Sequence, residues 1–180
     1  MLVGLGLSMF GFLASTLCAQ VKQEVPGNPL APAGPVQPIP YSHKLHLALS
    51  AKLECKGCHT NPDPGKLMTF PATSTCMKCH TSAAKNKPDI KKLAEYDKSK
   101  TAVPWVRVYS LRPGYEWTHH KHLDAGIRCG ACHGQVDQME VMSEVTSVVT
   151  MYSCLYCHKL HYAKTTCVTC HLYGTAGPYG

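Results

Sequence analysis

The sequence contains few of the large aromatic side chains that build most protein cores. Three Phe and two Trp occur in 180 residues, and Phe10 and Phe12 lie near the N-terminus, so the body keeps only Phe70. Charged residues make up only 16% of the chain. A body this poor in aromatics is not expected to fill its interior with side chains alone. Composition therefore argues against a large enzyme domain with an apolar core.

The first 21 residues lack any charge, and the basic region of a usual secretory signal is missing because the first lysine is Lys22. Residues 1–19 are apolar and long enough for a signal peptide or, marginally, for a membrane anchor. Cys18 adds a lipoprotein as a third alternative. Each of the three sends the rest of the chain across the membrane. We therefore predict an exported, periplasmic protein, with anchoring to the cytoplasmic membrane left open.

Proline is concentrated in one segment that follows the apolar N-terminus. Residues 21–40 hold six of the 13 prolines, and such a segment cannot form helices or sheet ladders. We predict that residues 20–40 form an extended linker, which serves as a tether or is disordered. Residues 41–180 are predicted to form a single folded domain.

Cysteine and histidine, by contrast, are abundant, with 11 of each. Ten cysteines fall in five copies of C-x-x-C-H, the attachment signature of c-type haem. Two cysteines three positions apart lie on one face of a helical turn, where each can form a thioether to a haem vinyl group. The histidine that follows supplies the proximal nitrogen to iron. The cysteine pairs are Cys55 and Cys58, Cys76 and Cys79, Cys129 and Cys132, Cys154 and Cys157, and Cys167 and Cys170, followed by His59, His80, His133, His158 and His171.

Zinc knuckles and disulfides are the alternatives for paired cysteines. Neither needs a histidine directly after each pair, whereas all five copies carry one. We therefore predict five haem c groups, which leaves about 28 residues of the range 41–180 for each haem. The predicted fold class is mostly irregular with short α-helices and little or no β, a multihaem cytochrome c domain whose core is formed by packed haems.

Six histidines remain for the sixth position of the irons, and four of them form two pairs. His43 and His46 precede the first motif, and His119 and His122 precede the third. In each pair the spacing is i,i+3, which places both imidazoles on one helical face and allows them to reach two adjacent haems. We predict that these four residues are distal ligands.

The other two histidines and the methionines are weaker candidates for distal ligands. His120 lies off the paired face, so we expect a structural role for it. His161 lies six residues before the fifth motif, as the paired histidines lie shortly before theirs, and is a distal candidate. Methionine is the other common sixth ligand and raises the haem potential. Met139 and Met151 are the candidates if one iron lacks a histidine, although methionine more often fills gaps in a core.

The net charge of +7 by itself suggests an anionic partner. Each ferric haem adds about −1, because two propionates outweigh the iron and ring, so five haems bring the total to about +2. We therefore predict no nucleic-acid partner. Residues 88–100 are predicted to form a short amphipathic helix with Pro88 in its first turn. Six lysines between Lys85 and Lys100 form either a docking face for an acidic partner or simply a solvated helix face.

Longer strings of the sequence carry a more specific resemblance. PVQPIPYSHKLH, TCMKCH, VPWVRVYSL, GIRCGACHGQVDQMEV and CLYCH follow one another between about residues 35 and 160. Together they resemble the pentahaem cytochrome subunit of alternative complex III. The resemblance implies a membrane-anchored periplasmic subunit that relays electrons from quinol oxidation towards a terminal oxidase, beside an iron–sulfur subunit and a monohaem cytochrome. It also implies distal roles for the two histidine pairs and assigns Met139 and Met151 to the methionine positions around the fourth motif.

The leading functional prediction is a non-catalytic electron carrier. Its predicted partners are other electron-transfer proteins, either cytochromes or iron–sulfur subunits, within a membrane complex. A free-standing periplasmic electron shuttle is one alternative. A multihaem reductase of a small oxidised substrate is another, but it needs an iron with an open site, and the nearly complete set of distal histidines argues against it.

Overall fold

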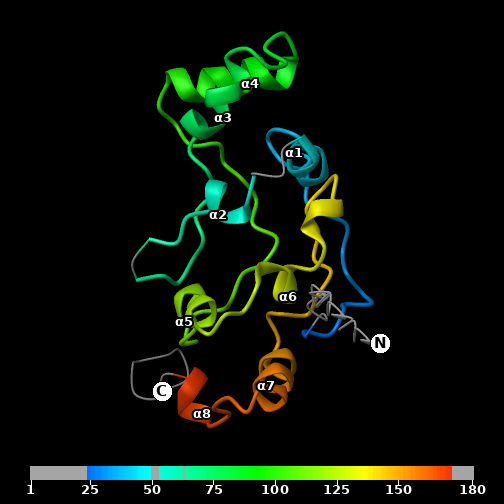
Figure 1. Ribbon diagram of the computed structural model, residues 1–180, viewed down its shortest axis with the longest axis vertical. Helices are drawn as coiled ribbons and strands as arrows, with labels where there is room; N and C mark the ends of the chain where they lie inside the picture. The colour runs from blue at the N-terminus through cyan, green and yellow to red at the C-terminus, as the bar shows by residue number, and fades with distance from the viewer. Residues whose placement is uncertain (1–23, 50–52, 63, 172–180) are drawn as a thin grey trace, which may run out of the picture.

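The computed structural model describes residues 24–49, 53–62 and 64–171, and these residues form short helices joined by long irregular segments (Figure 1). Within the described ranges there is no strand, only isolated bridges between Gly27 and Thr146 and between Tyr115 and His171. The helices are α1 (His43–Leu49), α2 (Cys55–Cys58), α3 (Thr73–His80), α4 (Pro88–Lys98), α5 (His119–Asp124), α6 (Cys129–His133), the 3-10 helix η1 (Val136–Gln138), α7 (Met151–Leu160) and α8 (Cys167–Cys170).

The helices are strung along an elongated molecule. Figure 1 shows α3 and α4 at one end, α1 and α2 next to them, α5 and α6 at mid-length, and α7 and α8 at the other end. The order along the long axis is therefore close to the order along the chain. The exception is the pair α3 and α4, which follow α1 and α2 in the sequence but lie beyond them at the end of the molecule.

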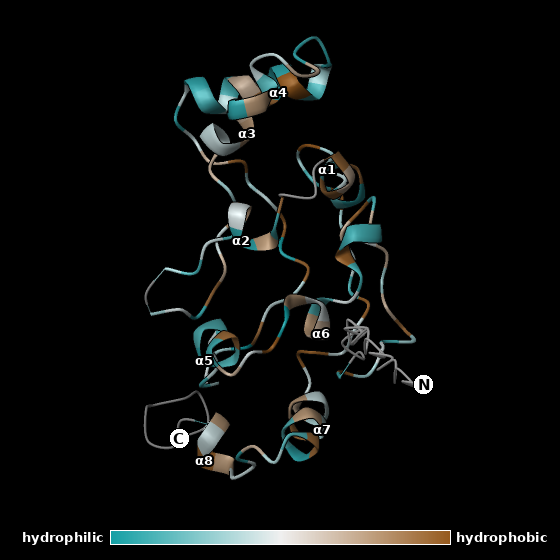
Figure 2. Ribbon diagram, in the orientation of Figure 1, coloured by the Kyte–Doolittle hydropathy of each residue, from teal (hydrophilic) through white to brown (hydrophobic). Residues whose placement is uncertain are grey.

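Few side chains are buried, as the low aromatic content predicts. The buried hydrophobic residues are Val25, Ile39, Leu93, Val103 and Ala131. Figure 2 shows hydrophobic residues scattered along the thin ribbon rather than gathered in one centre. The predicted fold class, mostly irregular with short helices, is confirmed. A chain with so small a core of its own depends on another group to fill its interior.

The largest apolar cluster lies at the α3–α4 end. Ile39, Leu93 and Val103 form its buried centre, and Ile90 and Trp105 pack against it. The amphipathic helix predicted over residues 88–100 is confirmed as α4, with Pro88 at its start and Leu93 turned inward. This cluster holds α4 against α3, the helix of the second motif.

The proline-rich segment differs from the expected free tether. It is extended, but residues 24–40 lie along the body of the molecule. Asn28 donates its backbone N–H to the Val145 carbonyl at 3.1 Å, and the Gln37 amide exchanges hydrogen bonds with the Val106 backbone at 2.9 Å. A proline-rich segment forms no helix or sheet, so its remaining backbone N–H and C=O groups are not paired within the segment. They can therefore form hydrogen bonds with irregular segments elsewhere in the chain.

The predicted signal peptide or anchor, residues 1–19, lies outside the described residues. Within the described ranges, no helix has the length and apolar character needed to cross a bilayer.

Candidate haem-binding sites

All five cysteine pairs lie on helices. Helices α2, α6 and α8 begin at the first cysteine of a motif, and α3 and α7 carry their pairs within longer helices. Glu54 directly precedes α2 and Arg128 directly precedes α6, and both have an extended backbone. These two helices therefore begin at the first cysteine of their motifs. The helical turn places both thiols of a pair on one face, as two thioethers to one ring require.

Four motif histidines face a histidine from elsewhere in the chain. Each of the two predicted distal pairs divides its members between two motifs, so that neighbouring residues on one helix reach two different sites. The ring centroids are separated by 6.4 Å for His43 and His59, 6.1 Å for His46 and His80, 6.4 Å for His119 and His133, and 6.2 Å for His122 and His158.

This separation is too long for direct ring stacking but fits two imidazoles bound to opposite sides of one iron. Metal–imidazole bonds are about 2.0–2.1 Å long, and a ring nitrogen lies about 1.1 Å from the ring centre. Two opposed ligand rings are therefore expected at about 6.3 Å between centroids. The four observed values, 6.1 to 6.4 Å, bracket that figure. The residues present fit four bis-histidyl haems.

Hydrogen bonds at Nδ1 fix the tautomer of six of these eight rings, that is, which ring nitrogen carries the proton. A ring whose Nδ1–H donates to a carbonyl keeps Nε2 unprotonated and available to a metal. The acceptors are the carbonyl of Ser42 for His46, Thr69 for His59, Ala83 for His80, Lys66 for His119, Thr118 for His122 and Lys164 for His158, at 2.6 to 2.9 Å.

The remaining two rings, His43 and His133, have a buried Nδ1 with no hydrogen-bond partner within the described ranges. Burial, and then the neighbouring histidines, lower the pKa of each to about 4. Both imidazoles are therefore neutral at pH 7, which is the form that binds a metal.

The helices that carry the distal pairs, α1 and α5, share one local design. Ser42 precedes α1 and its hydroxyl accepts the Leu45 N–H at 2.9 Å, while Thr118 precedes α5 and accepts the Lys121 N–H at 3.1 Å. These side chains are N-caps, which define where a short helix starts. Each cap therefore fixes the start of the turn from which two imidazoles project.

An aromatic residue sits two positions before each distal pair. Tyr41 meets His43 edge-on at 4.9 Å and stacks on His46 at 4.3 Å. Trp117 meets His119 edge-on at 4.3 Å and stacks on His122 at 5.4 Å. One flat ring thereby sets the orientation of both imidazoles of its pair.

The sequence interpretation missed these supporting residues, although their signal is in the printed sequence. The pattern aromatic–Ser/Thr–His–x–x–His occurs at residues 41–46 and again at 117–122. Its repetition identifies the aromatic and the hydroxyl residue as part of each site.

A loop from the first part of the chain supports a histidine of the second. The Lys66 carbonyl accepts the hydrogen bond from His119, and the Gly65 carbonyl accepts the His120 backbone N–H at 3.1 Å. Gly65 has a φ of 76°, and a Cβ there would lie 2.5 Å from the His120 Cβ. Only glycine allows this approach without strain. The His120 Nε2 itself lies 3.1 Å from the Asp124 carboxylate.

A cleft of about 330 Å³ opens between α2 and α5. Its lining includes His59 and Met68 on one side and His120 and Leu123 on the other. The cleft therefore gives solvent-side access to the space beside the first motif.

The cysteines that influence one another electrostatically indicate the order of the motifs in space. Burial raises the pKa of Cys76, Cys55, Cys132 and Cys154, and in each case a cysteine of another motif is the next cause. Those neighbours are Cys58 for Cys76, Cys129 for Cys55, Cys157 for Cys132 and Cys170 for Cys154. The motifs therefore follow one another in the order second, first, third, fourth, fifth, which agrees with the helices in Figure 1.

The fifth motif has a different setting. The loop that precedes α5 holds it, because Glu116 donates its N–H to the Cys170 carbonyl at 2.8 Å and the Tyr115 ring lies 5.1 Å from the His171 ring. The distal candidate His161 donates its Nε2–H to the Glu24 carboxylate, at 3.0 Å. Met139 lies beside α1, where its carbonyl accepts the Lys44 N–H, and Met151 is exposed at the start of α7.

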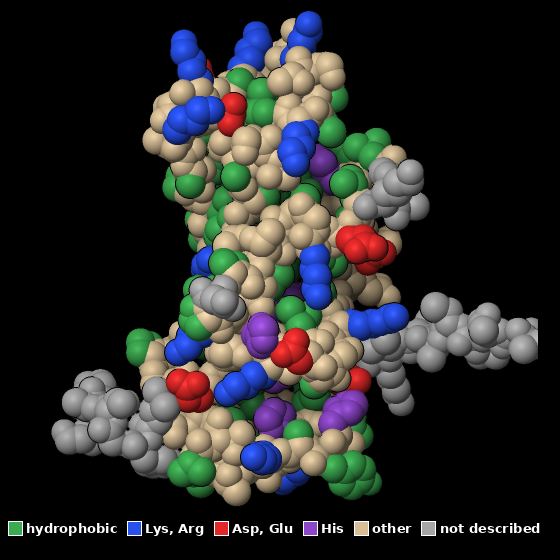
Figure 3. Space-filling view, turned by 60° about the vertical axis from the view of Figure 1, so that its left-hand side comes forward, with side chains coloured by type: hydrophobic (Ala, Val, Ile, Leu, Met, Phe, Trp, Pro, Cys, Tyr) green, Lys and Arg blue, Asp and Glu red, His purple; other side chains and the backbone are tan. Residues whose placement is uncertain are grey.

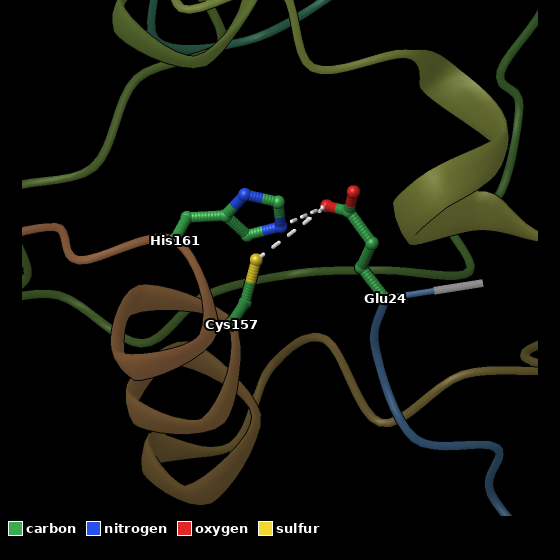
Figure 4. A group of neighbouring side chains, drawn as sticks. All are labelled: Glu24, Cys157 and His161. Atoms are coloured by element: carbon green, nitrogen blue, oxygen red, sulfur yellow. Dashed lines mark hydrogen bonds and ion pairs between the residues drawn. The ribbon is translucent and has the colours of Figure 1, made fainter. Parts of the chain in front are cut away.

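Glu24, Cys157 and His161 come together at α7 (Figure 4). The Cys157 Sγ lies 3.8 Å from the Glu24 carboxylate that also contacts His161. Such a trio resembles a metal site, but Cys157 belongs to the fourth haem motif, and a thioether sulfur offers no thiolate to a separate ion. We therefore interpret Glu24 and His161 as an ion pair that ties the N-terminal segment to α7.

Comparison with known proteins supports this chemistry. The chain is 36% identical over 99 residues to the multiheme cytochrome c subunit of menaquinone reductase from Nitratidesulfovibrio vulgaris, a match that covers 54% of this chain and 45% of the relative. The match, with the five C-x-x-C-H motifs, supports a multihaem c-type cytochrome. The chain spans less than half the length of that relative, and no family model matches it. The relative's name does not extend to alternative complex III, so that resemblance stays a prediction.

Proposed function

We propose that this cytochrome carries five haem c groups in a single row and passes electrons along it. The order of the row is second, first, third, fourth and fifth motif. The observation that carries the proposal is the set of four facing imidazole pairs, at 6.1 to 6.4 Å, threaded along neighbouring motifs.

The chain's own residues hold and orient the haems. Cysteine pairs on the short helices would attach each ring, and the motif histidines would bind its iron. His43, His46, His119 and His122 would bind the same irons as the motif histidines that they face, and carbonyl acceptors at Nδ1 hold His46, His119 and His122 in the binding tautomer. When bound, each haem supplies a site for one electron. The sixth ligand of the fifth haem is proposed to be His161 or Met151, since Met139 lies beside α1, far from α8.

The two i,i+3 pairs would hold neighbouring haems close together. His43 and His46 belong to one turn of α1 but face the first and second motif histidines, and His119 and His122 do the same for the third and fourth. One helical turn therefore brings two haems together. Close spacing favours transfer of electrons from one haem to the next and leaves little room for a substrate at these four irons.

The proposed setting is a quinone-linked respiratory complex on the periplasmic side of the cytoplasmic membrane. The relative is a subunit of a menaquinone reductase, which supports quinone-linked electron transfer. The alternative setting, a complex of alternative complex III type, would add an iron–sulfur subunit and a monohaem cytochrome as partners. Subunits that co-purify with this chain from washed membranes will distinguish the two.

Removing one haem at a time tests the proposed row. A photoreductant attached at Lys87→Cys delivers electrons beside the second motif, and haem reduction is followed after each flash. We expect the variant Cys129→Ser/Cys132→Ser, which lacks the third haem, to accept electrons rapidly only at the second and first haems. The matched variant Cys167→Ser/Cys170→Ser lacks the last haem and is expected to fill all that remain.

Intact mass gives the haem count of each variant before the flash experiment. Fewer than five haems on the unaltered chain contradicts the proposal directly. Equal filling in the two variants refutes the proposed order. A high-spin ferric signal that shifts with added nitrite or cyanide would instead favour a reductase.

A further inference from the structure

The charge of the molecule is concentrated at the α3–α4 end. Residues 78–100 carry seven lysines against three carboxylates, a net +4 of the chain's +7. Figure 3 shows lysine and arginine side chains gathered at the top of the molecule, where this end lies. We call residues 78–100 the basic end. Its lysines are Lys78, Lys85, Lys87, Lys91, Lys92, Lys98 and Lys100.

These lysines are exposed and are not neutralised within the chain. All seven are solvent-exposed, and none of them forms an ion pair with a carboxylate in the described ranges. Asp97 instead accepts a hydrogen bond from Thr73. An uncompensated cluster of one sign attracts a partner of the opposite sign and raises its rate of encounter.

The basic end is directly connected to the second motif, which occupies one end of the proposed row. Lys78 lies between the two cysteines of that motif, and the His80 ring donates to the Ala83 carbonyl at 2.9 Å. Ala84 then has a φ of 54°, an unusual value for a residue with a Cβ, and the Lys87 N–H closes the turn onto its carbonyl. The turn that presents Lys85 and Lys87 is therefore held in one shape by the motif histidine.

The apolar side chains of α4 point inward. Leu93 is buried, Ile90 and Tyr96 pack against the same cluster, and no large hydrophobic side chain is exposed between residues 71 and 105. A surface helix that binds a bilayer needs apolar side chains to insert. A protein partner with acidic side chains is therefore favoured over a lipid surface.

We propose that the basic end is the docking surface for an acidic one-electron redox protein, which exchanges electrons with the haem of the second motif. This inference rests on the proposed function, because it needs that haem at an end of the row. The partner carries carboxylates around its own redox group. One electron passes between the two proteins, so that one centre is oxidised and the other reduced.

Charge reversal at the turn tests this docking surface. The full-length holoprotein is mixed with a reduced acidic plant-type ferredoxin as the probe, and haem reduction is followed by stopped flow. For K85E/K87E/K91E at low ionic strength we expect the second-order rate to fall by at least about tenfold. Added salt is expected to slow the unaltered protein and to have little effect on the variant.

A second triple variant controls for net charge. R112E/R128E/K159E makes the same change in charge at exposed positions outside the basic end. Its rate is expected to fall much less, and an equal fall in both variants overturns the proposal. Glutamate near the N-terminus of α4 favours the helix. If the first variant still fails to fold, K85Q/K87Q/K91Q is expected to give a smaller fall, and no fall overturns the proposal.

Two further measurements separate the remaining outcomes. Intact mass and full reduction by dithionite test the proposed function independently of docking, because neither depends on a partner. Vesicles that contain phosphatidylserine test the lipid alternative. Binding to these vesicles that K85E/K87E/K91E abolishes, together with unchanged ferredoxin rates, overturns the proposal in favour of a membrane surface.

Discussion

Two parts of the molecule are built on the same plan. The first unit, residues 41–80, and the second unit, residues 117–158, each begin with an aromatic residue, a capping hydroxyl and a histidine pair. In each, the first histidine of the pair faces the next motif histidine, and the second faces the one after it. The agreement in local contacts shows that a unit for two haems occurs twice in this chain.

The units differ mainly in what is attached to them. The first continues from α3 into α4 and ends in the basic surface, whereas the second continues from α7 to the fifth motif. They also differ at the buried Nδ1 atoms. The unpaired atom belongs to His43, a predicted distal ligand, in the first unit and to His133, a motif histidine, in the second. The plan is therefore constant in which histidines face one another, and it varies in the segment that follows each unit and in which ring lacks a partner at Nδ1.

Replacement of the second distal histidine is expected to have the largest effect and tests whether the units are equivalent. Methionine in place of histidine raises the potential of a haem. For His46→Met and His122→Met we expect one haem in each variant to rise by on the order of 0.1 V, within the range of about 0.8 V that axial ligands span. A redox titration followed by absorption measures both shifts.

His120→Met is the control for these two variants, because His120 lies on α5 but faces Asp124. We expect it to leave all potentials unchanged. A shift in only one of the two units would show that the shared local contacts do not carry over to the haems. A shift with His120→Met would show that this residue, too, is near an iron.

Sequence alone predicts the repeated chemistry but not its connections. The five motifs, the helix over α4 and the fold class are all short-range signals, set by spacing and composition. Which distal histidine faces which motif depends on contacts between residues far apart in the chain, such as His46 with His80. The support of His119 by Lys66 depends likewise on the positive φ of Gly65. Only the folded chain shows these relations.

Gly65→Ala tests the contact that joins the two units. Its φ of 76° strains any residue with a Cβ, by about 1–3 kcal/mol. The new Cβ also lies 2.5 Å from the His120 Cβ, which adds an overpacking cost of about 1–3 kcal/mol. We expect a loss of stability in denaturant unfolding and a changed low-spin signal from the haem at His119, since Lys66 moves with the loop.

Gly114→Ala separates the two costs in Gly65→Ala. Gly114 has a φ of 94°, but a Cβ there meets nothing within 4 Å. We expect Gly114→Ala to lose only the stability that backbone strain costs, without any change in the low-spin signal of the haem at His119. Equal losses of stability in the two variants would contradict a close contact between the loop and α5.

Removal of the helix caps is expected to have the smallest effect and to distinguish the units by burial. Loss of an N-cap hydroxyl costs about 0.5–2 kcal/mol. Thr118 is only 7% exposed, whereas Ser42 is half-buried, so Thr118→Ala also removes a buried methyl group and is expected to cost more than Ser42→Ala. Denaturant unfolding followed by the low-spin haem absorption measures both. Thr166→Ala is the control, because Thr166 precedes α8 without capping it, and it is expected to leave stability nearly unchanged. Equal losses of stability from Thr118→Ala and Ser42→Ala would mean that the hydroxyl alone sets the cost and that the two caps are equivalent. A loss from Thr166→Ala as large as theirs would mean that capping is not what stabilises α1 and α5.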